Sequence, residues 1–222
     1  MTVPASNSAA MIRTLGLVAT LCGVLIVAAY QGTLPAVTAN KKLALERAVK
    51  ALIPDATAVI EYDASPTGIH PASGEPPAGA IRFYAAYDRK HQLKAIAAEG
   101  AARGYADVVR VLYGYDPQCQ CVFGIRVVQM RETPGIGDKV LTDPAFLANF
   151  TRLDVSLASD LKAMANAVRT VKHGTKQHPW EIDAISGATI TSKAIGRAIN
   201  DNAQTLLPRL YPNLAALRNP SP

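Results

Sequence analysis

The sequence has few of the residues that build metal centres or disulfide frameworks. Its 222 residues include three cysteines and four scattered histidines. The histidines lack metal spacing and Cys119 and Cys121 have no further ligands nearby, so no metal site is predicted. The spacing Cys119-Gln-Cys121 predicts two side chains on one face of a strand, which suits burial, and the three cysteines make no disulfide framework.

Several sequence patterns of catalytic and nucleic-acid-binding proteins are also missing. The sequence has no GxGxxG dinucleotide loop, no cysteine cluster for an iron–sulfur centre and no Ser/His/Asp or Cys/His set. The net charge of +6 and the pI near 9.3 suit a membrane surface or acidic partners. Because the basic residues are dispersed, without an Arg-rich run or an aromatic-interleaved basic strand, we expect no nucleic-acid binding.

Charge is absent from residues 14–40, and this gap contains a long apolar run. About 20 mainly apolar residues span a bilayer as a helix, and residues 12–31 supply that length, with Tyr30 at one interface and Arg13 at the other. We predict an N-terminal tail over 1–11, a transmembrane helix over 12–31 and one domain over 38–222. The competing interpretation is a cleaved signal peptide with a small-x-small site at 37–39.

The charges that flank the apolar run conflict with an extracytoplasmic domain. Lys41, Lys42, Arg47 and Lys50 follow the run, whereas Arg13 alone precedes it. A literal positive-inside count would place the domain in the cytoplasm, although long domains can translocate regardless of charge.

The domain predicted over 38–222 mixes strand and helix patterns, so its predicted class is α+β. A hairpin is expected around the turn at 114–117. Strands are predicted at 57–62, 81–87, 93–98, 108–113, 121–129 and 168–171. Helices are predicted at 38–53, 144–168 (broken around 151–157) and 191–207, the last ending at Pro208, while 65–79 is predicted to be a surface loop.

Residues 183–192, Asp-Ala-Ile-Ser-Gly-Ala-Thr-Ile-Thr-Ser, predict a turn that opens the last helix. Thr191 or Ser192 can cap this helix, whose N-terminus favours phosphate. The small residues before it would let a bulky group approach the backbone. A capped helix after a glycine turn explains the same pattern without a ligand. The candidate ligand-binding residues are Asp183, Ser186, Gly187, Ala188, Thr189, Thr191 and Ser192.

A second stretch, Glu132-Thr-Pro-Gly-Ile-Gly137, follows a predicted strand. Thr133, Pro134 and Gly135 suit a type II turn, in which Gly135 takes a positive φ. Gly137 offers a second place where backbone can lie against a ligand. Glu132 is a candidate to influence that ligand through the residues that contact it. An ordinary turn after a strand is the alternative.

The two stretches together resemble the flavin subunits of the Rnf electron-transport complex and the sodium-pumping NADH:quinone oxidoreductase (Nqr). Asp-x-x-Ser-Gly-Ala-Thr is similar to the attachment motif of covalent FMN-binding domains. The resemblance implies FMN joined to Thr189 by a phosphoester, a Mg-dependent flavin transferase that uses FAD, and a recognition or metal-binding role for Asp183 during attachment. It also implies that the loop at 132–137 lies against the flavin. Trp180 could stack on the flavin or anchor the core.

The resemblance is strongest to the G subunit of the Rnf complex. It implies a transmembrane helix followed by one mixed α+β FMN-binding domain outside the cytoplasm. Such a protein is a single-pass electron-transfer subunit of the cell membrane that works with other membrane subunits of an ion-translocating complex. No independent catalytic site is evident. The alternatives are the C subunit of Nqr, which is usually longer, a free-standing surface-tethered FMN carrier, and an anchored binding module without redox chemistry.

Overall fold

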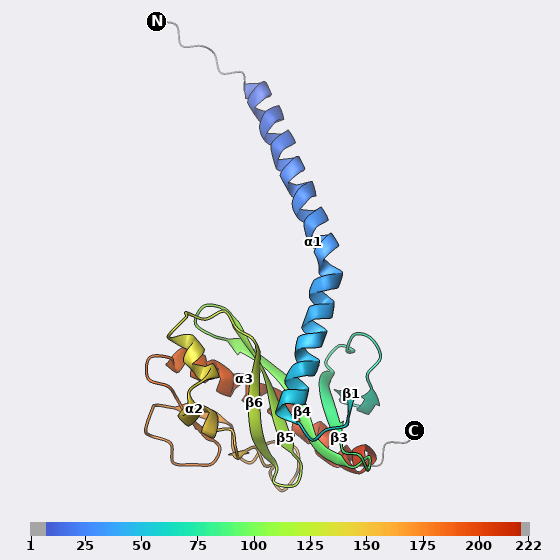
Figure 1. Cartoon of the computed structure of the whole chain (residues 1–222), viewed down its shortest axis with the longest axis vertical. Helices are drawn as coiled ribbons and strands as arrows, with labels where there is room; N and C mark the ends of the chain where they lie inside the picture. The colour runs from blue at the N-terminus through green and yellow to red at the C-terminus, as the bar shows by residue number, and fades with distance from the viewer. Residues whose placement is uncertain (1–7, 219–222) are drawn as a thin grey trace, which may run out of the picture. The chain divides into compact units, whose positions relative to one another are not determined.

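The structure, a computed structural model, describes residues 8–218 of the chain (Figure 1). The chain divides into two compact units, one up to Leu45 and one from Glu46. Of the predicted N-terminal tail, residues 1–7 lie outside the described part, and residues 8–11 are helical.

Helix α1 (Ser8–Leu52) is continuous over 45 residues and includes Pro35. The helix predicted at 38–53 is therefore not a separate element but the end of α1. At 1.5 Å per residue, α1 is about 68 Å long, more than twice a hydrocarbon core of about 30 Å. By length and composition α1 can cross a membrane, with a mean hydropathy of 2.1 in its apolar window, whose residues are not buried within the structure.

The second unit is built on a seven-stranded antiparallel sheet in the order β2-β1-β3-β4-β5-β6-β7. Apolar residues alternate along β5, so that Val109, Val111, Tyr113 and Tyr115 enter the core. The strands are β1 (Ala58–Ser65), β2 (Gly68–Pro71), β3 (Ile81–Tyr87), β4 (Leu93–Arg103), β5 (Val108–Asp116), β6 (Cys121–Gln129) and β7 (Leu153–Asp154). Strand β2 lies within the predicted loop 65–79, which is therefore partly a hairpin.

Helix α3 (Thr189–Leu210) packs against β4 and β5 and covers the core. It does not end before Pro208 as predicted, but continues to Leu210 and is followed by η2 (Tyr211–Asn213) and α4 (Leu214–Arg218). Its buried side chains recur at helical spacing. They include Ala194, Ile195, Ala198, Ile199, Ala203, Leu206, Leu207 and Leu210.

The helix predicted at 144–168 is wrong except for its first five residues. A 3-10 helix, η1 (Gly137–Leu141), precedes α2 (Pro144–Ala148), which is capped by the Asp143 side chain and has Asn149 at its C-cap position. The chain then forms β7, and Leu153 in this strand and Val155 just after it are both buried in the core, at strand spacing. Apolar residues in this segment satisfy both a helical and an alternating pattern, and pairing with β6 decides between them.

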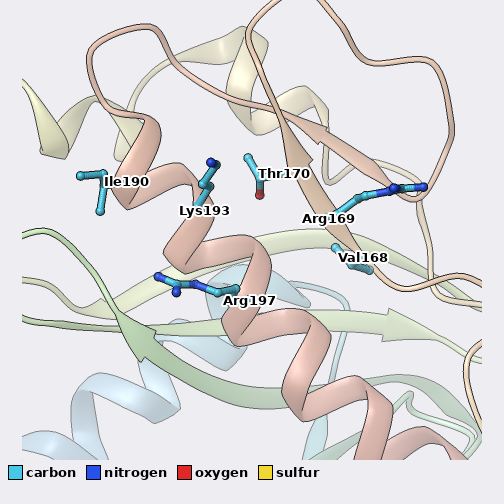
Figure 2. A pocket seen from close by; sticks show the side chains of 6 residues that line it. All are labelled: Val168, Arg169, Thr170, Ile190, Lys193 and Arg197. Atoms are coloured by element: carbon cyan, nitrogen blue, oxygen red, sulfur yellow. The ribbon is translucent and has the colours of Figure 1, made fainter.

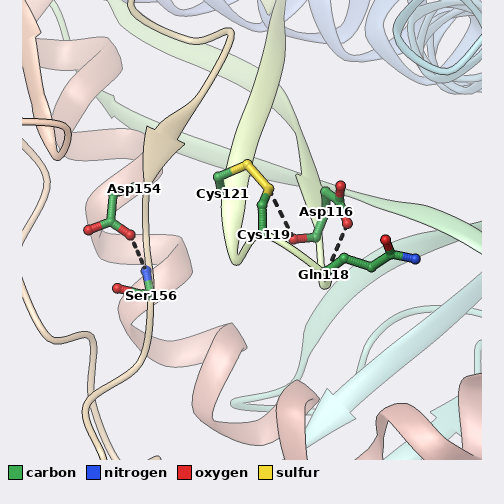
Figure 3. Close-up of a disulfide and its surroundings, with 6 residues drawn as sticks. All are labelled: Asp116, Gln118, Cys119, Cys121, Asp154 and Ser156. Carbon is green, nitrogen blue, oxygen red and sulfur yellow. Dashed lines mark hydrogen bonds between the residues drawn. A yellow bond between two sulfur atoms is a disulfide. The ribbon is translucent and has the colours of Figure 1, made fainter.

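A disulfide joins Cys119 to Cys121 at the tip of the β5–β6 hairpin (Figure 3). This corrects the prediction that both cysteines lie on one strand. Strand β5 continues to Asp116, which moves the turn from 114–117 to 117–120, and Gln120 takes a φ of +51°. The turn brings the two sulfurs together, whereas residues i and i+2 of a regular strand are held apart by the extended backbone.

Candidate functional site

The predicted turn before α3 is present and ends at Thr189. The backbone N–H of Ala188 donates to the carbonyl of Ile185 at 3.0 Å, and Gly187 has a φ of +85°. Glycine suits this conformation because it has no Cβ to clash. Ser186 and Gly187 are exposed, and Thr189 is half-buried. Thr189 is therefore presented at the surface by a tight turn.

Helix α3 begins at Thr189 with Ala188 at its N-cap position, so neither Thr191 nor Ser192 caps it. Both hydroxyls are buried and serve other contacts. Ser192 Oγ donates to the Ala188 carbonyl at 2.9 Å and accepts from the Ile185 N–H at 3.2 Å. It thereby fastens the turn to the first turn of the helix. No side chain of the described residues caps this helix end, and the N–H groups of its first turn are available to an anion.

Glu132 connects the second predicted loop to this helix. Its Oε2 accepts a hydrogen bond from Thr191 Oγ1 at 2.9 Å, and its Oε1 accepts one from the Ala106 N–H at 3.2 Å. A Cβ added at Gly137 would lie 2.7 Å from Glu132 Cβ and 3.2 Å from Thr191 Oγ1. Gly137 is therefore needed for close packing at this junction.

The turn that starts at Thr133 is also present. The Thr133 carbonyl accepts hydrogen bonds from Ile136 and Gly137, and Gly135 has a φ of +75°. The predicted positive φ at Gly135 is thus confirmed. A Cβ at Gly135 would meet no atom within 4 Å, so the glycine is required by backbone conformation and not by space. Ile136 beside it is 51% exposed, and Ile190, which follows Thr189 on α3, is 50% exposed, so each presents apolar surface.

Asp183 lies at the end of β9 (Glu181–Asp183), which pairs in parallel with β8 (Arg169–Val171). Its carboxylate accepts from the Gly174 N–H at 2.7 Å and lies 3.3 Å from the His173 ring. Asn149, which the sequence did not single out, bonds both the N–H and the carbonyl of Asp183. Asp183 therefore orders the loop before the motif, and its contacts within the described residues are not with Thr189.

Trp180 does not lie in the core between sheet and helix. It is half-buried, stacks on His178 at 4.5 Å between ring centroids, and precedes Glu181. The Glu181 carboxylate accepts from the N–H groups of Gln177 and His178. These bonds, with the Gln177 contribution largest, lower the pKa of Glu181.

The residues present fit a phosphate-linked group on Thr189. The Thr189 hydroxyl stands at a helix N-terminus without a side-chain cap, where backbone dipoles favour a negative charge. The Thr189 hydroxyl donates a hydrogen bond to the Ile185 carbonyl oxygen at 3.4 Å. A carbonyl oxygen is too weak a base to take the hydroxyl proton. The carboxylates of Glu132 and Asp183 are engaged by other groups. The described residues thus hold an acceptor hydroxyl but do not supply the base that would activate it.

A pocket of about 280 Å³ lies between β8 and α3, and Ile190, the residue after Thr189, is part of its lining (Figure 2). Thr170 Oγ1 on β8 donates to the Ser192 carbonyl at 3.3 Å and ties the two walls together. Sequence reasoning missed this pocket, although Lys193 and Arg197 follow Thr189 at spacings of four and eight. Val168, Arg169, Thr170, Ile190, Lys193 and Arg197 line it.

One family of known proteins matches a region of the chain that contains both predicted ligand-binding stretches. The FMN-binding domain family matches residues 104–204, a range that includes Glu132, Gly137 and Thr189. The chain is 30% identical over 212 residues to the G subunit of the ion-translocating oxidoreductase complex of Shewanella loihica, covering 88% of this chain and 91% of that protein. It is 34% identical over 116 residues to the G subunit of the Na(+)-translocating ferredoxin:NAD(+) oxidoreductase complex of Acetobacterium woodii.

The extent of the matches differs among relatives. The Acetobacterium alignment covers 52% of this chain, and the chain spans about half the length of several curated relatives it matches, 48% for that protein and 50% for one from Pasteurella multocida. Among solved structures, the NqrC protein of Shewanella oneidensis is similar with a TM-score of 0.60 and 19% identity. That similarity covers 81% of this chain and 98% of the other, and it confirms the α+β fold.

Proposed function

Because the chain belongs to the G-subunit family of ion-translocating oxidoreductase complexes, we propose that it is a membrane-anchored electron-transfer subunit of an Rnf-type complex, with FMN joined to Thr189 by a phosphoester. The observation that carries the proposal is the Thr189 hydroxyl at the start of α3, within the matched FMN-binding region. Other membrane subunits of the complex are its proposed partners.

FMN, when bound, supplies reversible acceptance and release of electrons. The chain supplies attachment and orientation. Thr189 fixes the phosphate end, and the free N–H groups at the start of α3 stabilise the phosphate charge. Exposed Ile136 and Ile190 provide apolar surface for the ring system, and Glu132 holds the Thr133–Gly137 turn against α3 through Thr191.

Attachment requires a partner protein, because the described residues supply no base for the Thr189 hydroxyl. We propose that a flavin transferase with FAD as donor provides this activation. Asp183 then acts by shaping the loop that the transferase recognises, through its contacts with Gly174 and His173.

Membrane anchoring is assigned to residues 12–31 of α1, and the flavin domain to residues 38–222. The Cys119–Cys121 disulfide supports an extracytoplasmic domain, since disulfides persist in oxidising compartments. The four basic residues after the apolar run favour the opposite orientation, but their influence is weak for long domains, which translocate largely regardless of charge.

The second candidate is the C subunit of an Nqr-type complex, and the fold similarity to NqrC favours it. That similarity is 19% in sequence, whereas the Shewanella loihica relative is 30% identical across almost its whole length. The sequence comparison therefore favours the Rnf assignment.

The proposal is tested by producing the full chain together with a flavin transferase and denaturing it in detergent. Covalent flavin remains fluorescent on the denatured protein band, and Thr189→Ala should abolish that fluorescence. Thr205→Ala, at an exposed position of α3, is the matched control and should keep it. A fluorescent Thr189→Ala band would exclude Thr189 as the attachment residue.

A further inference from the structure

Three cationic residues are among those that line the pocket between β8 and α3. Arg169 comes from β8, and Lys193 and Arg197 come from α3 (Figure 2). On a helix, residues four apart are neighbours at about 6 Å, so Thr189, Lys193 and Arg197 follow one another along one face. Ile190, which follows Thr189 in the chain, also lines the pocket, so the pocket lies at the first turns of the helix that Thr189 opens.

Glu181 Oε1 lies 3.7 Å from Arg169 Nε and compensates the charge of that side chain. The two cations of α3 have no carboxylate partner of this kind among the described residues. Arg197 donates to the carbonyl of Arg103, which carries no net charge. Lys193 makes no ion pair with any residue in the described part of the chain. An uncompensated cluster of this kind attracts an anion with several acceptor oxygens.

We propose that this pocket is a phosphate-binding site that serves flavin attachment at Thr189. The inference rests on the proposed function. Attachment forms a bond between Thr189 Oγ1 and the flavin-side phosphorus of FAD and breaks the bond from that phosphorus to the bridging oxygen. AMP leaves with that oxygen, and the hydroxyl proton passes to a base of the transferase.

Two phosphates thus come near the pocket, one that stays on Thr189 and one that departs with AMP. Both present anionic oxygens to Lys193 and Arg197. A cation placed where negative charge develops stabilises a leaving group, and a cation beside a retained phosphate neutralises it. Each role makes Lys193 and Arg197 positioning residues for the phosphate chemistry of Thr189.

The test measures calorimetric binding of inorganic pyrophosphate to the full chain in detergent micelles, made without transferase and therefore without flavin. Lys193→Met with Arg197→Gln should weaken binding by at least about tenfold, because it removes two charge-assisted partners. Arg89→Gln with Lys94→Met is the matched control, since it removes the same two charges from exposed positions outside the pocket. The control should bind like the unmodified chain.

Repeating the titration after FMN attachment distinguishes the two phosphates. Loss of pyrophosphate binding means that the retained phosphate fills the pocket, and continued binding means that the pocket serves the departing one. The proposal is overturned if the flavin-free chain does not bind pyrophosphate, or if both double variants bind equally. Failure of the function proposal is detected separately, as the absence of FMN from the intact mass of transferase-treated protein.

Discussion

Thr191 Oγ1, in the first turn of α3, donates a hydrogen bond at 2.9 Å to Oε2 of Glu132, a residue 59 positions earlier in the sequence. This contact places the Thr133–Gly137 turn beside the start of α3. Thr191 is buried and Glu132 is half-buried, so water cannot readily replace the carboxylate as the partner of the Thr191 hydroxyl. The contact therefore couples the two stretches, 132–137 and 183–192, that the family resemblance assigns to flavin binding.

Removing this hydrogen bond should destabilise the domain. Thr191→Val keeps the side-chain shape but leaves the Glu132 carboxylate short of one donor, which should cost about 1–3 kcal/mol. Thr205→Val, on the exposed side of the same helix, is the control for β-branched replacement. Urea unfolding measures both variants. Equal free energies of unfolding would show that the contact between Glu132 and Thr191 contributes nothing.

Gly135→Val should strain the second loop, because valine disfavours a φ of +75°. The expected cost is roughly 1–3 kcal/mol. We expect FMN attachment to continue while the flavin absorption spectrum and midpoint potential shift. Gly74→Val introduces the same strain at a φ of +74° in another loop, and should leave the flavin unchanged. A Gly135→Val protein with an unaltered spectrum and potential would remove this loop from the flavin environment.

Glu181 should make the stability of the β8–β9 region depend on pH. Its pKa is lowered in the folded state by the Gln177 and His178 N–H groups, so its carboxylate contributes stability above its unfolded pKa. That contribution is lost as the pH falls through the lower folded pKa. Glu181→Gln should therefore destabilise the protein at pH 7, with the difference fading below about pH 4. Thermal unfolding across pH, with exposed Glu75→Gln as control, measures this; a pH-independent difference would contradict it.

The orientation of the chain is tested by a reporter fused after Leu210. We expect alkaline phosphatase activity and retention in the membrane pellet after a carbonate wash. In the same cells Cys119 and Cys121 should resist a thiol reagent until reduced, since they form a disulfide. Activity of a cytoplasmic reporter at this position, with both thiols labelled, would overturn the localisation. A soluble product starting near Asn40 would favour the cleaved signal peptide.

Local geometry was the most predictable part of this protein. The turn before Thr189 and the positive φ of Gly135 follow from short patterns in which glycine has few substitutes. The core face of α3 likewise follows from helical spacing. Its start at Thr189 was missed because the Thr191 and Ser192 hydroxyls, which suit a cap, are used for contacts with Glu132 and Ala188.

Contacts between distant segments could not be predicted from the sequence. The bond from Asn149 to Asp183 and the pocket formed by Arg169 and Lys193 depend on how α3 lies beside β8 and β9. The Cys119–Cys121 disulfide depends on where β5 ends, a boundary that a propensity pattern fixes only to within a few residues. The helix predicted at 144–168 failed for another reason, because the apolar spacing of this segment fits both a helix and a strand.

The central claim is the bond between FMN and Thr189. Its most direct test is peptide mapping by tandem mass spectrometry of protein produced with the transferase. We expect one FMN per chain, and fragment ions that place the flavin phosphate on Thr189. Fragments that place it on Thr191 or Ser192, or an intact mass without FMN, would contradict the account.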